Sequence, residues 1–191
     1  MLTGPKQIGY ISYQEKEPRG NEVLVRTLVS GIKHGTEINL YRGANPFAKE
    51  IFDPVLRLFR PPQDGEQVAP WYPHRLGSWA VGVVEAVGPD VRRFKPGDVV
   101  HGPWSHRTGM IISEGRIFPV APDVDRETML FTDPGLFALA STHDAEIKLG
   151  DRVAIFGLGA IGLLAVQMAK LSGAAQVFAV DMIPSRLALA K

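Results

Sequence analysis

Three closely spaced glycines near the end of the chain could hold a diphosphate. Residues 157–162 read GLGAIG, and they follow a short apolar run and precede a stretch rich in alanine and leucine. In such a motif the first glycine permits a tight turn, the second lets a phosphate approach the backbone, and the third allows close packing of a helix on a strand. The free N–H groups at the start of that helix favour an anion. The sequence therefore predicts dinucleotide binding by Gly157, Gly159, Ala160, Ile161 and Gly162.

An acidic residue follows at the distance expected of a ribose-binding carboxylate. Asp181 lies 19 residues after Gly162 (181 − 162 = 19), close to the offset of roughly 20 residues in dinucleotide-binding units. A carboxylate there would repel a 2′-phosphate, so NAD(H) is favoured over NADP(H). Arg186 could reach the same neighbourhood and is a second candidate cofactor contact. The alternative is a βαβ unit that needs its glycines only for the turn.

A strand, a helix and a second strand must position these residues, and the sequence predicts all three. Short apolar runs before and after the motif are typical of strands buried on both faces, and the stretch between them is helical in composition. Pro184 would be tolerated in the first turn of a further helix. The elements predicted are strands over 152–156 and 176–180 and helices over 163–171 and 186–191.

The part of the chain before residue 150 is mostly β in pattern. Apolar and polar residues alternate in short segments separated by Gly and Pro, which predicts antiparallel strands in a small barrel or sandwich. Helical spacing follows over 128–146. The predicted strands are 22–30, 79–87, 98–101, 110–113 and 117–120.

Residues 45–76 interrupt the strand pattern with many Pro, Phe, Trp and Tyr residues. A segment of this length without periodicity is typical of a functional lid or insertion. Its aromatic side chains could line an apolar pocket, or they could simply pack the segment against its own domain.

The composition excludes several classes of partner. Lys and Arg number 21 and Asp and Glu 20, which gives a formal net charge of +1, so neither nucleic acid nor a membrane surface is expected as a partner. There is no cysteine, and hence no disulfide and no thiolate ligand for a metal. No apolar run approaches the roughly 18 residues of a membrane helix. We expect a soluble, cytoplasmic protein that acts on a small molecule.

Several blocks of the chain together resemble the medium-chain dehydrogenase/reductases, the alcohol dehydrogenase-like superfamily. These blocks are SGIKHGTEINLYRG, GVVEAVGPDVRRFKPGDVV, GDRVAIFGLGAIGLLAVQMAKLSGA and VFAVD. The resemblance implies an α/β chain with a β-rich N-terminal part. A GroES-like catalytic domain would span residues 1–123, a helical connector 124–149, and the first βαβ unit of a Rossmann NAD-binding domain 150–191. Its chemistry would be hydride transfer between NAD(H) and an alcohol or carbonyl substrate.

A complete Rossmann domain has about six parallel strands, whereas only 41 residues follow Gly150. We therefore expect the chain to be a C-terminally truncated piece of a longer protein and to be inactive by itself. Family members usually pair through Rossmann strands, so the resemblance implies a homodimer for the complete protein.

The zinc ligands of the family are largely replaced. By resemblance, His34 occupies the position of the first ligand, a cysteine, and Ser78 and Trp79 replace the His and Glu of the second motif. Asp133 aligns with a third, acidic ligand. A catalytic zinc needs three protein ligands and an open position, so we predict a zinc-independent branch. His101 or His106 could act as a substitute ligand.

The resemblance also indicates which residues could handle the proton. Thr36 holds the position of the family's Thr or Ser beside the substrate oxygen, but a hydroxyl needs a relay near neutral pH. The usual relay histidine is replaced by Asn39. We predict that His34 serves beside Thr36, with Tyr41 as the alternative; the competing interpretation is that the His34 ring only satisfies a turn.

Three charged residues around these positions, Lys33, Glu37 and Arg42, are predicted at a solvated loop edge. Two other functions remain open: an NADPH-dependent enoyl or quinone reductase, and a non-catalytic dinucleotide-binding protein.

Overall fold

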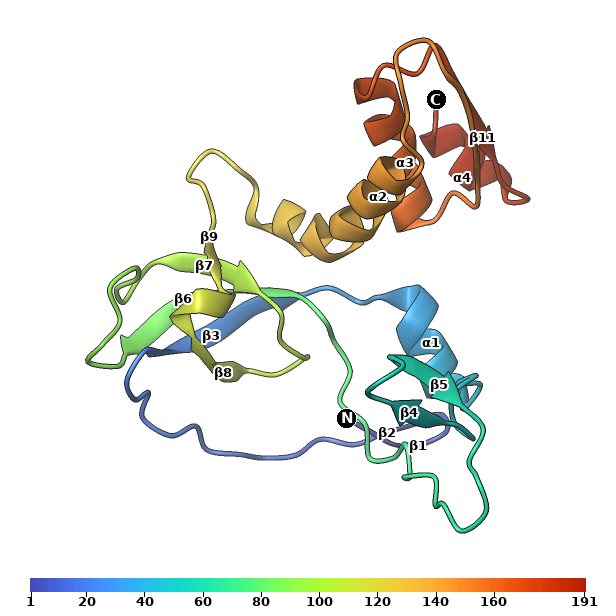
Figure 1. Cartoon of the computed structure of the whole chain (residues 1–191). Helices are drawn as coiled ribbons and strands as arrows, with labels where there is room; N and C mark the ends of the chain where they lie inside the picture. Colours follow the sequence, from blue (N-terminus) through green and yellow to red (C-terminus); the bar gives the residue numbers. More distant parts are fainter. The chain divides into compact units, whose positions relative to one another are not determined.

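The computed structural model describes residues 1–191, which form two compact units, Met1–Ala121 and Pro122–Lys191 (Figure 1). The helix inside the predicted connector, α2 (Thr132–Asp144), packs against α3 (Ala160–Leu171) in the second unit. Thr142 is buried in this contact, with its Oγ1 3.9 Å from Sδ of Met168. Helix α2 therefore belongs to the second unit and buries one face, at Ala138 and Thr142, against α3.

A five-stranded antiparallel sheet organises the first unit. Its strand order is β8-β3-β6-β7-β9, and every neighbouring pair is antiparallel. The strands predicted from alternation are thus confirmed within one or two residues at each end. They are β3 (Glu22–Ser30), β6 (Ala80–Val87), β7 (Val99–Gly102), β8 (Gly109–Ser113) and β9 (Phe118–Pro119), with a 3₁₀ turn, η1 (Glu114–Arg116), before the last.

One face of this sheet carries the core. Alternate residues of β3 and β6 point to the same side because successive strand side chains alternate between faces. The indole of Trp104 lies among them and donates a hydrogen bond from Nε1 to Oγ1 of Thr27 at 3.0 Å. The buried cluster comprises Val23, Val25, Ala80, Val84, Val100, Trp104, Ile112 and Ile117.

Helix α1 (His34–Arg42) lies where the sequence predicts a loop. An acidic residue in its first turn, Glu37, and a basic one in its last, Arg42, both complement the helix dipole. The helix ends at Gly43, whose φ of 73° is the left-handed conformation that glycine adopts without strain. The loop prediction was therefore wrong. The local signals are supported by tertiary contacts of the helix, such as that of Glu37 with His106, which could not be recognised in the sequence.

The aromatic segment is not wholly irregular. It contains an antiparallel hairpin of β4 (Ile51–Asp53) and β5 (Leu58–Arg60), in which Phe52 pairs with Phe59. A second small hairpin at the start of the chain joins β1 (Leu2–Gly4) to β2 (Gln7–Ile8). An isolated bridge between Leu2 and His74 connects the two regions.

The second unit contains the predicted strand, helix, strand arrangement. Strand β10 (Arg152–Phe156) is parallel to β11 (Gln176–Val180), with α3 between them in the chain. The prediction that both strands are buried on both faces was wrong: Phe156 is 78% exposed and Phe178 53%. Helix α3 contacts both strands, but alternate side chains on the sheet are uncovered in this structure. The remaining helices are η2 (Arg126–Phe131) and α4 (Pro184–Leu189).

No helix of the structure is both long enough and apolar enough to span a membrane.

Candidate active site

The glycine-rich loop between β10 and α3 shows three different backbone requirements. Gly157 has a φ of 89° and donates its N–H to the carbonyl oxygen of Val180 at 2.8 Å. A Cβ at Gly162 would collide with the carbonyl oxygen of Gly157, so this position needs glycine for close packing of helix on strand. A Cβ at Gly159 would meet nothing within 4 Å. The protein itself therefore gives no steric reason for glycine at 159, whereas a bound group would.

The start of α3 faces that open position. Gly159 is the N-terminal capping residue of the helix, and no side chain caps it. Ala160 and Ile161 are the first two helical residues, and their N–H groups have no carbonyl acceptor one turn earlier within the helix. Such a helix start can receive an anion. The loop has the steric and electrostatic features that a diphosphate would need.

Asp181 is held close to this loop. Its Oδ2 accepts a hydrogen bond from the N–H of Leu158 at 2.6 Å, and its Oδ1 accepts one from the N–H of Ile183 at 2.8 Å. Nη1 of Arg186 lies 3.5 Å from Oδ2. These two backbone donors, helped by the guanidinium, hold the pKa of Asp181 below its ordinary value.

These contacts give Asp181 a structural role that the sequence did not predict. Its side chain is only 6% exposed. A carboxylate has about four acceptor positions, and three donors already occupy part of that capacity. Room remains for a ribose hydroxyl, but the carboxylate also fixes the ends of β10 and β11 to each other.

The predicted proton-handling residues all lie on α1. His34 is its first residue and Thr36 lies in its first turn, and both are exposed. Tyr41 lies five residues beyond Thr36, about 7.5 Å further along the helix axis. The structure therefore places His34 and Thr36 at one end of the helix and Tyr41 near the other, and no hydrogen bond joins the three side chains.

The sequence predicts Glu37 at a solvated loop edge, and this prediction was wrong. The residue is buried, with 8% of its surface exposed. Its Oε1 accepts the N–H of Lys33 at 2.8 Å, and its Oε2 lies 3.0 Å from Nε2 of His106. The other ring nitrogen of His106, Nδ1, lies 2.8 Å from Oγ of Ser30. Helix α1 turns this face inward, where the carboxylate meets His106 in the segment before β8, and His106 in turn meets Ser30 at the end of β3.

Burial alone would raise the pKa of Glu37. Hydrogen bonds from His106 and from the N–H groups of Lys33 and Gly77 outweigh burial, and the pKa is lowered. Glu37 is thus a carboxylate held ionised beneath the turn that carries Thr36. The sequence did not predict this role for Glu37, because its partner His106 lies 69 residues away in the chain and a single charged residue does not indicate such a partner.

Trp79, which replaces a residue of the family's second zinc motif, and the two candidate substitute ligands, His101 and His106, form hydrogen bonds with other side chains of the protein. Nε1 of Trp79 donates a hydrogen bond to Nδ1 of His101 at 3.1 Å, and both residues are buried. Burial lowers the pKa of His101, which therefore stays neutral. One ring nitrogen of His101 and both of His106 already have protein partners, and no group of three or more His, Asp or Glu side chains is arranged to hold a metal. In this structure these ring nitrogens are therefore engaged by protein partners.

Comparison with known proteins identifies the family. The model of the alcohol dehydrogenase GroES-like domain matches residues 19–117. The chain belongs to this family. It is a member of the medium-chain dehydrogenase/reductase superfamily, which confirms the resemblance deduced from the sequence and the α/β fold with a β-rich N-terminal part.

Individual relatives of this GroES-like chain are dehydrogenases and oxidoreductases. It is 32% identical over 195 residues to D-guloside 3-dehydrogenase of Escherichia coli, covering 100% of this chain and 56% of that protein. A quinone oxidoreductase of Pseudomonas syringae has a similar structure, with a TM-score of 0.71 and 26% identity over 100% of this chain and 53% of that one. A 2R,3R-butanediol dehydrogenase of Bacillus subtilis shares the fold, with a TM-score of 0.75 and 22% identity over 100% of this chain and 59% of that one. The chain spans little more than half the length of each.

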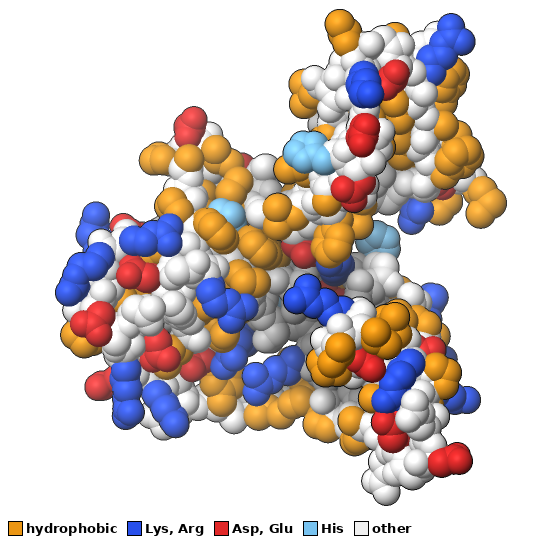
Figure 2. Space-filling view, in the orientation of Figure 1, with side chains coloured by type: hydrophobic (Ala, Val, Ile, Leu, Met, Phe, Trp, Pro, Cys, Tyr) orange, Lys and Arg blue, Asp and Glu red, His pale blue; other side chains and the backbone are white.

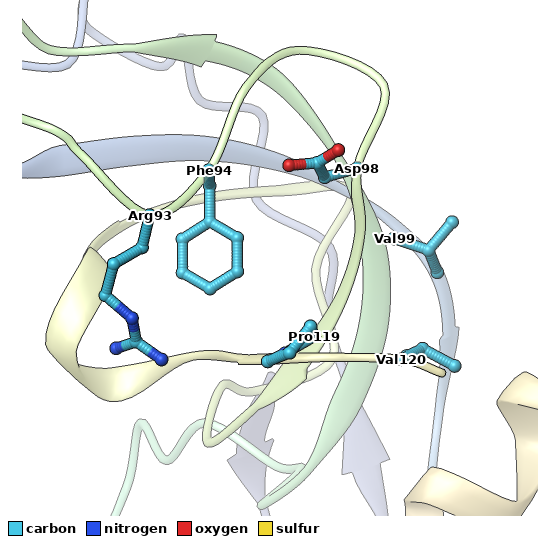
Figure 3. A pocket seen from close by; sticks show the side chains of 6 residues that line it. All are labelled: Arg93, Phe94, Asp98, Val99, Pro119 and Val120. Atoms are coloured by element: carbon cyan, nitrogen blue, oxygen red, sulfur yellow. The ribbon is translucent and has the colours of Figure 1, made fainter. Parts of the chain in front are cut away.

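Neither of two pockets in the GroES-like unit is lined by His34 or Thr36. The smaller, of about 270 Å³, lies beside β7 and β9, where Arg93, Phe94 and Asp98 surround it (Figure 3). Its polar groups are used locally, since Asp98 accepts the N–H of Lys95 and Arg93 donates to the carbonyl of Glu114. The larger, of about 380 Å³, lies in the aromatic segment. Phe52, Phe59 and Trp71 line this pocket and also pack against one another, so each of the two alternatives left open by the sequence holds in part.

Proposed function

We propose that this protein acts as a zinc-independent oxidoreductase that transfers a hydride between NAD(H) and an alcohol or carbonyl substrate. The observation that carries the proposal is the loop of residues 157–162, in which the space over Gly159 is open and the start of α3 is uncapped. The dehydrogenase relatives support the reaction class, and the whole protein's activity, its cytoplasmic location and a homodimeric state belong to the same proposal.

The coenzyme would lie across the start of α3. The N–H groups of Ala160 and Ile161 would bind the diphosphate, and Asp181 would use its remaining acceptor capacity on the adenine ribose. A 2′-phosphate would bring further negative charge to a carboxylate that is held ionised, so NAD(H) is preferred. Arg186 weakens that preference by neutralising part of the charge. When bound, the nicotinamide supplies or accepts the hydride.

The substrate oxygen would lie at the N-terminal end of α1. The Thr36 hydroxyl donates a hydrogen bond to this oxygen as charge develops, and the positive end of the helix dipole stabilises the same charge. His34 supplies the proton from the same turn. Glu37 holds that turn in place from below through its bonds to Lys33 and His106.

The relatives support a particular substrate class. Because D-guloside 3-dehydrogenase is similar over the whole of this chain, we infer that the oxidised group is a ring hydroxyl of a sugar derivative. The similarity to a quinone oxidoreductase favours the second candidate, a reductase acting with NADPH on an activated C=C bond or quinone.

Steady-state kinetics of the complete protein tests these assignments. His34→Ala is expected to lower kcat at least tenfold and to change the pH profile of kcat, whereas Lys16→Ala, at an exposed position in the same unit, should change neither. An unchanged profile in His34→Ala would exclude the role given to His34.

Faster turnover of quinones with NADPH would support the reductase, and NADH binding without turnover of any substrate would indicate a non-catalytic protein. One stoichiometric zinc in the purified protein would contradict the metal-free assignment.

A further inference from the structure

The larger pocket of the first unit combines aromatic walls with a few polar groups. It has a volume of about 380 Å³, within the range of small-molecule sites. Phe52, Phe59 and Trp71 are its aromatic lining residues, and Glu50, Gln67 and His74 are lining residues with polar side chains. Figure 2 shows hydrophobic side chains at the surface over β4 and β5, and Phe52 is 50% exposed. The pocket therefore has an open side and a wall that a ligand can reach.

The aromatic walls are fixed by packing. Phe59 stacks on Phe47 with ring centroids 4.3 Å apart and meets the edge of Phe52 at 5.3 Å. Trp71 is tilted against Phe59 at 6.5 Å, and its Nε1 donates a hydrogen bond to the carbonyl oxygen of Phe47 at 3.2 Å. The indole plane is therefore oriented before any ligand binds.

Charged groups beside the pocket brace the hairpin. Arg60 donates from Nη1 and Nη2 to the two carboxylate oxygens of Glu66 at 2.6 and 2.7 Å, and its Nε lies 3.6 Å from Asp53. His74 is anchored through its backbone, which exchanges hydrogen bonds with Leu2 at 2.8 and 2.9 Å. A site formed in advance loses less conformational entropy on binding.

The lining selects against anions. No Lys or Arg lines the pocket, while Glu50 lines it and makes no ion pair in the structure. A phosphate or carboxylate ligand would therefore face an uncompensated negative charge. Glu50 offers hydrogen-bond acceptors, Gln67 offers both donors and acceptors, and the ring of His74 can do either. This set suits neighbouring hydroxyl groups, each of which donates and accepts.

We propose that this pocket binds the ring of a glycoside, with one face of the pyranose against Trp71 and Phe52 and its hydroxyl groups bonded to Glu50, Gln67 and His74. The C–H groups on a pyranose face are apolar, and they gain dispersion contacts from an aromatic ring. The proposal rests on the proposed function, because it gives the sugar-type substrate a binding site away from α1. That site would hold a part of the substrate other than the reacting hydroxyl.

Nuclear magnetic resonance of the ¹⁵N-labelled chain without coenzyme tests the site. The protein has three tryptophans, so three indole N–H signals are expected, and Trp71→Phe assigns the one that matters. Titration with methyl β-D-glucopyranoside is expected to shift the Trp71 signal saturably. The Trp104 signal should stay in place, because that indole is 3% exposed and bonded to Thr27.

Variants and other ligands separate this site from simpler explanations. Glu50→Gln should lower the affinity for the glycoside about tenfold, as expected for loss of a charged acceptor. The exposed control Glu17→Gln should leave the affinity unchanged. The dispersion of each spectrum reports whether the variant is folded. Cyclohexanol should bind at least tenfold more weakly than the glycoside. A Trp71 shift produced by tetramethylammonium but not by the glycoside would overturn the proposal in favour of a cation site.

The two proposals fail in different ways. If the glycoside leaves the Trp71 signal unmoved while the complete protein still oxidises sugars, the pocket assignment is wrong and the proposed function stands. If the glycoside binds here with the expected variant effects but no substrate is turned over, the proposed function is wrong and the binding site stands.

Discussion

Nε2 of His106 lies 3.0 Å from Oε2 of Glu37, and this contact joins two segments that are 69 residues apart in the sequence. Glu37 belongs to the first turns of α1, and His106 precedes β8. Nδ1 of His106 continues the network to Oγ of Ser30 at the end of β3. The turn that carries His34 and Thr36 is therefore attached to the sheet through polar side chains.

Replacement of Glu37 should change how stability depends on pH. Because the folded-state pKa of Glu37 is below its ordinary value, its contribution is present above about pH 4.5 and is lost as the pH falls through the folded-state pKa. In Glu37→Gln the free energy of unfolding should fall by about 1–2 kcal/mol at pH 7. The profile between pH 3 and 6, measured by urea denaturation, should be flatter than in the wild type. Equal slopes in the two proteins would contradict this.

His106 and Glu37 should be energetically coupled. His106→Ala leaves a buried carboxylate with one donor fewer, so we expect a loss of about 2 kcal/mol. The double variant with Glu37→Gln should be more stable than the sum of the single losses predicts, with a coupling energy of about 1 kcal/mol. Denaturation of all four proteins at pH 7 measures this value. Strict additivity would mean that the contact contributes nothing to stability.

The two glycines of the loop should respond differently to alanine. Gly162→Ala brings a methyl group against the carbonyl of Gly157, and we expect a loss of about 1–3 kcal/mol in stability. Gly159→Ala meets no protein atom within 4 Å, so stability should change by less than about 0.5 kcal/mol. If the coenzyme diphosphate lies over Gly159, the affinity for NADH should nonetheless fall. Fluorescence titration with NADH and thermal unfolding measure the two effects separately, and unchanged NADH affinity in Gly159→Ala would contradict the placement.

Asp181→Asn tests the coenzyme preference. The amide keeps the shape of the side chain but loses the negative charge that disfavours a 2′-phosphate. The ratio of the dissociation constants of NADPH and NADH should therefore fall, by roughly tenfold if one charge contact is relieved. Arg186→Ala should raise the same ratio, because it removes the cation 3.5 Å from Asp181. Shifts of both variants in the same direction would show that these residues do not set the preference.

Acid should release Asp181 in the wild-type protein as well. Its folded-state pKa is lowered by the N–H groups of Leu158 and Ile183, so its stabilising contribution is present above its ordinary pKa and is lost as the pH falls through the lowered value. Hydrogen exchange at Leu158 should accelerate in that acid range relative to Val166, which lies in the middle of α3. Constant relative protection would contradict the assignment.

Much of this fold could be predicted because its signals are local. Alternation over residues 22–30 is the pattern of one strand face, and Gly157, Gly159 and Gly162 carry their spacing in the sequence itself. Helix α1 could not be predicted in the same way. Its nine residues include Gly35 and Asn39, and Gly43 follows directly, and all three residues are of types common in turns. Its inward face depends on contacts with distant strands.

The sequence by itself determined the strands of the five-stranded sheet, the β10–α3–β11 unit, the glycine-rich loop and the family resemblance, because periodicity and spacing are properties of neighbouring residues. Only the tertiary structure decided that Glu37 is buried against His106 and that Asp181 bonds to the N–H of Leu158. It also decided that Phe52, Phe59 and Trp71 enclose a pocket. Such pairings depend on how the chain returns upon itself, and residue types alone do not specify which partner a buried polar group will meet.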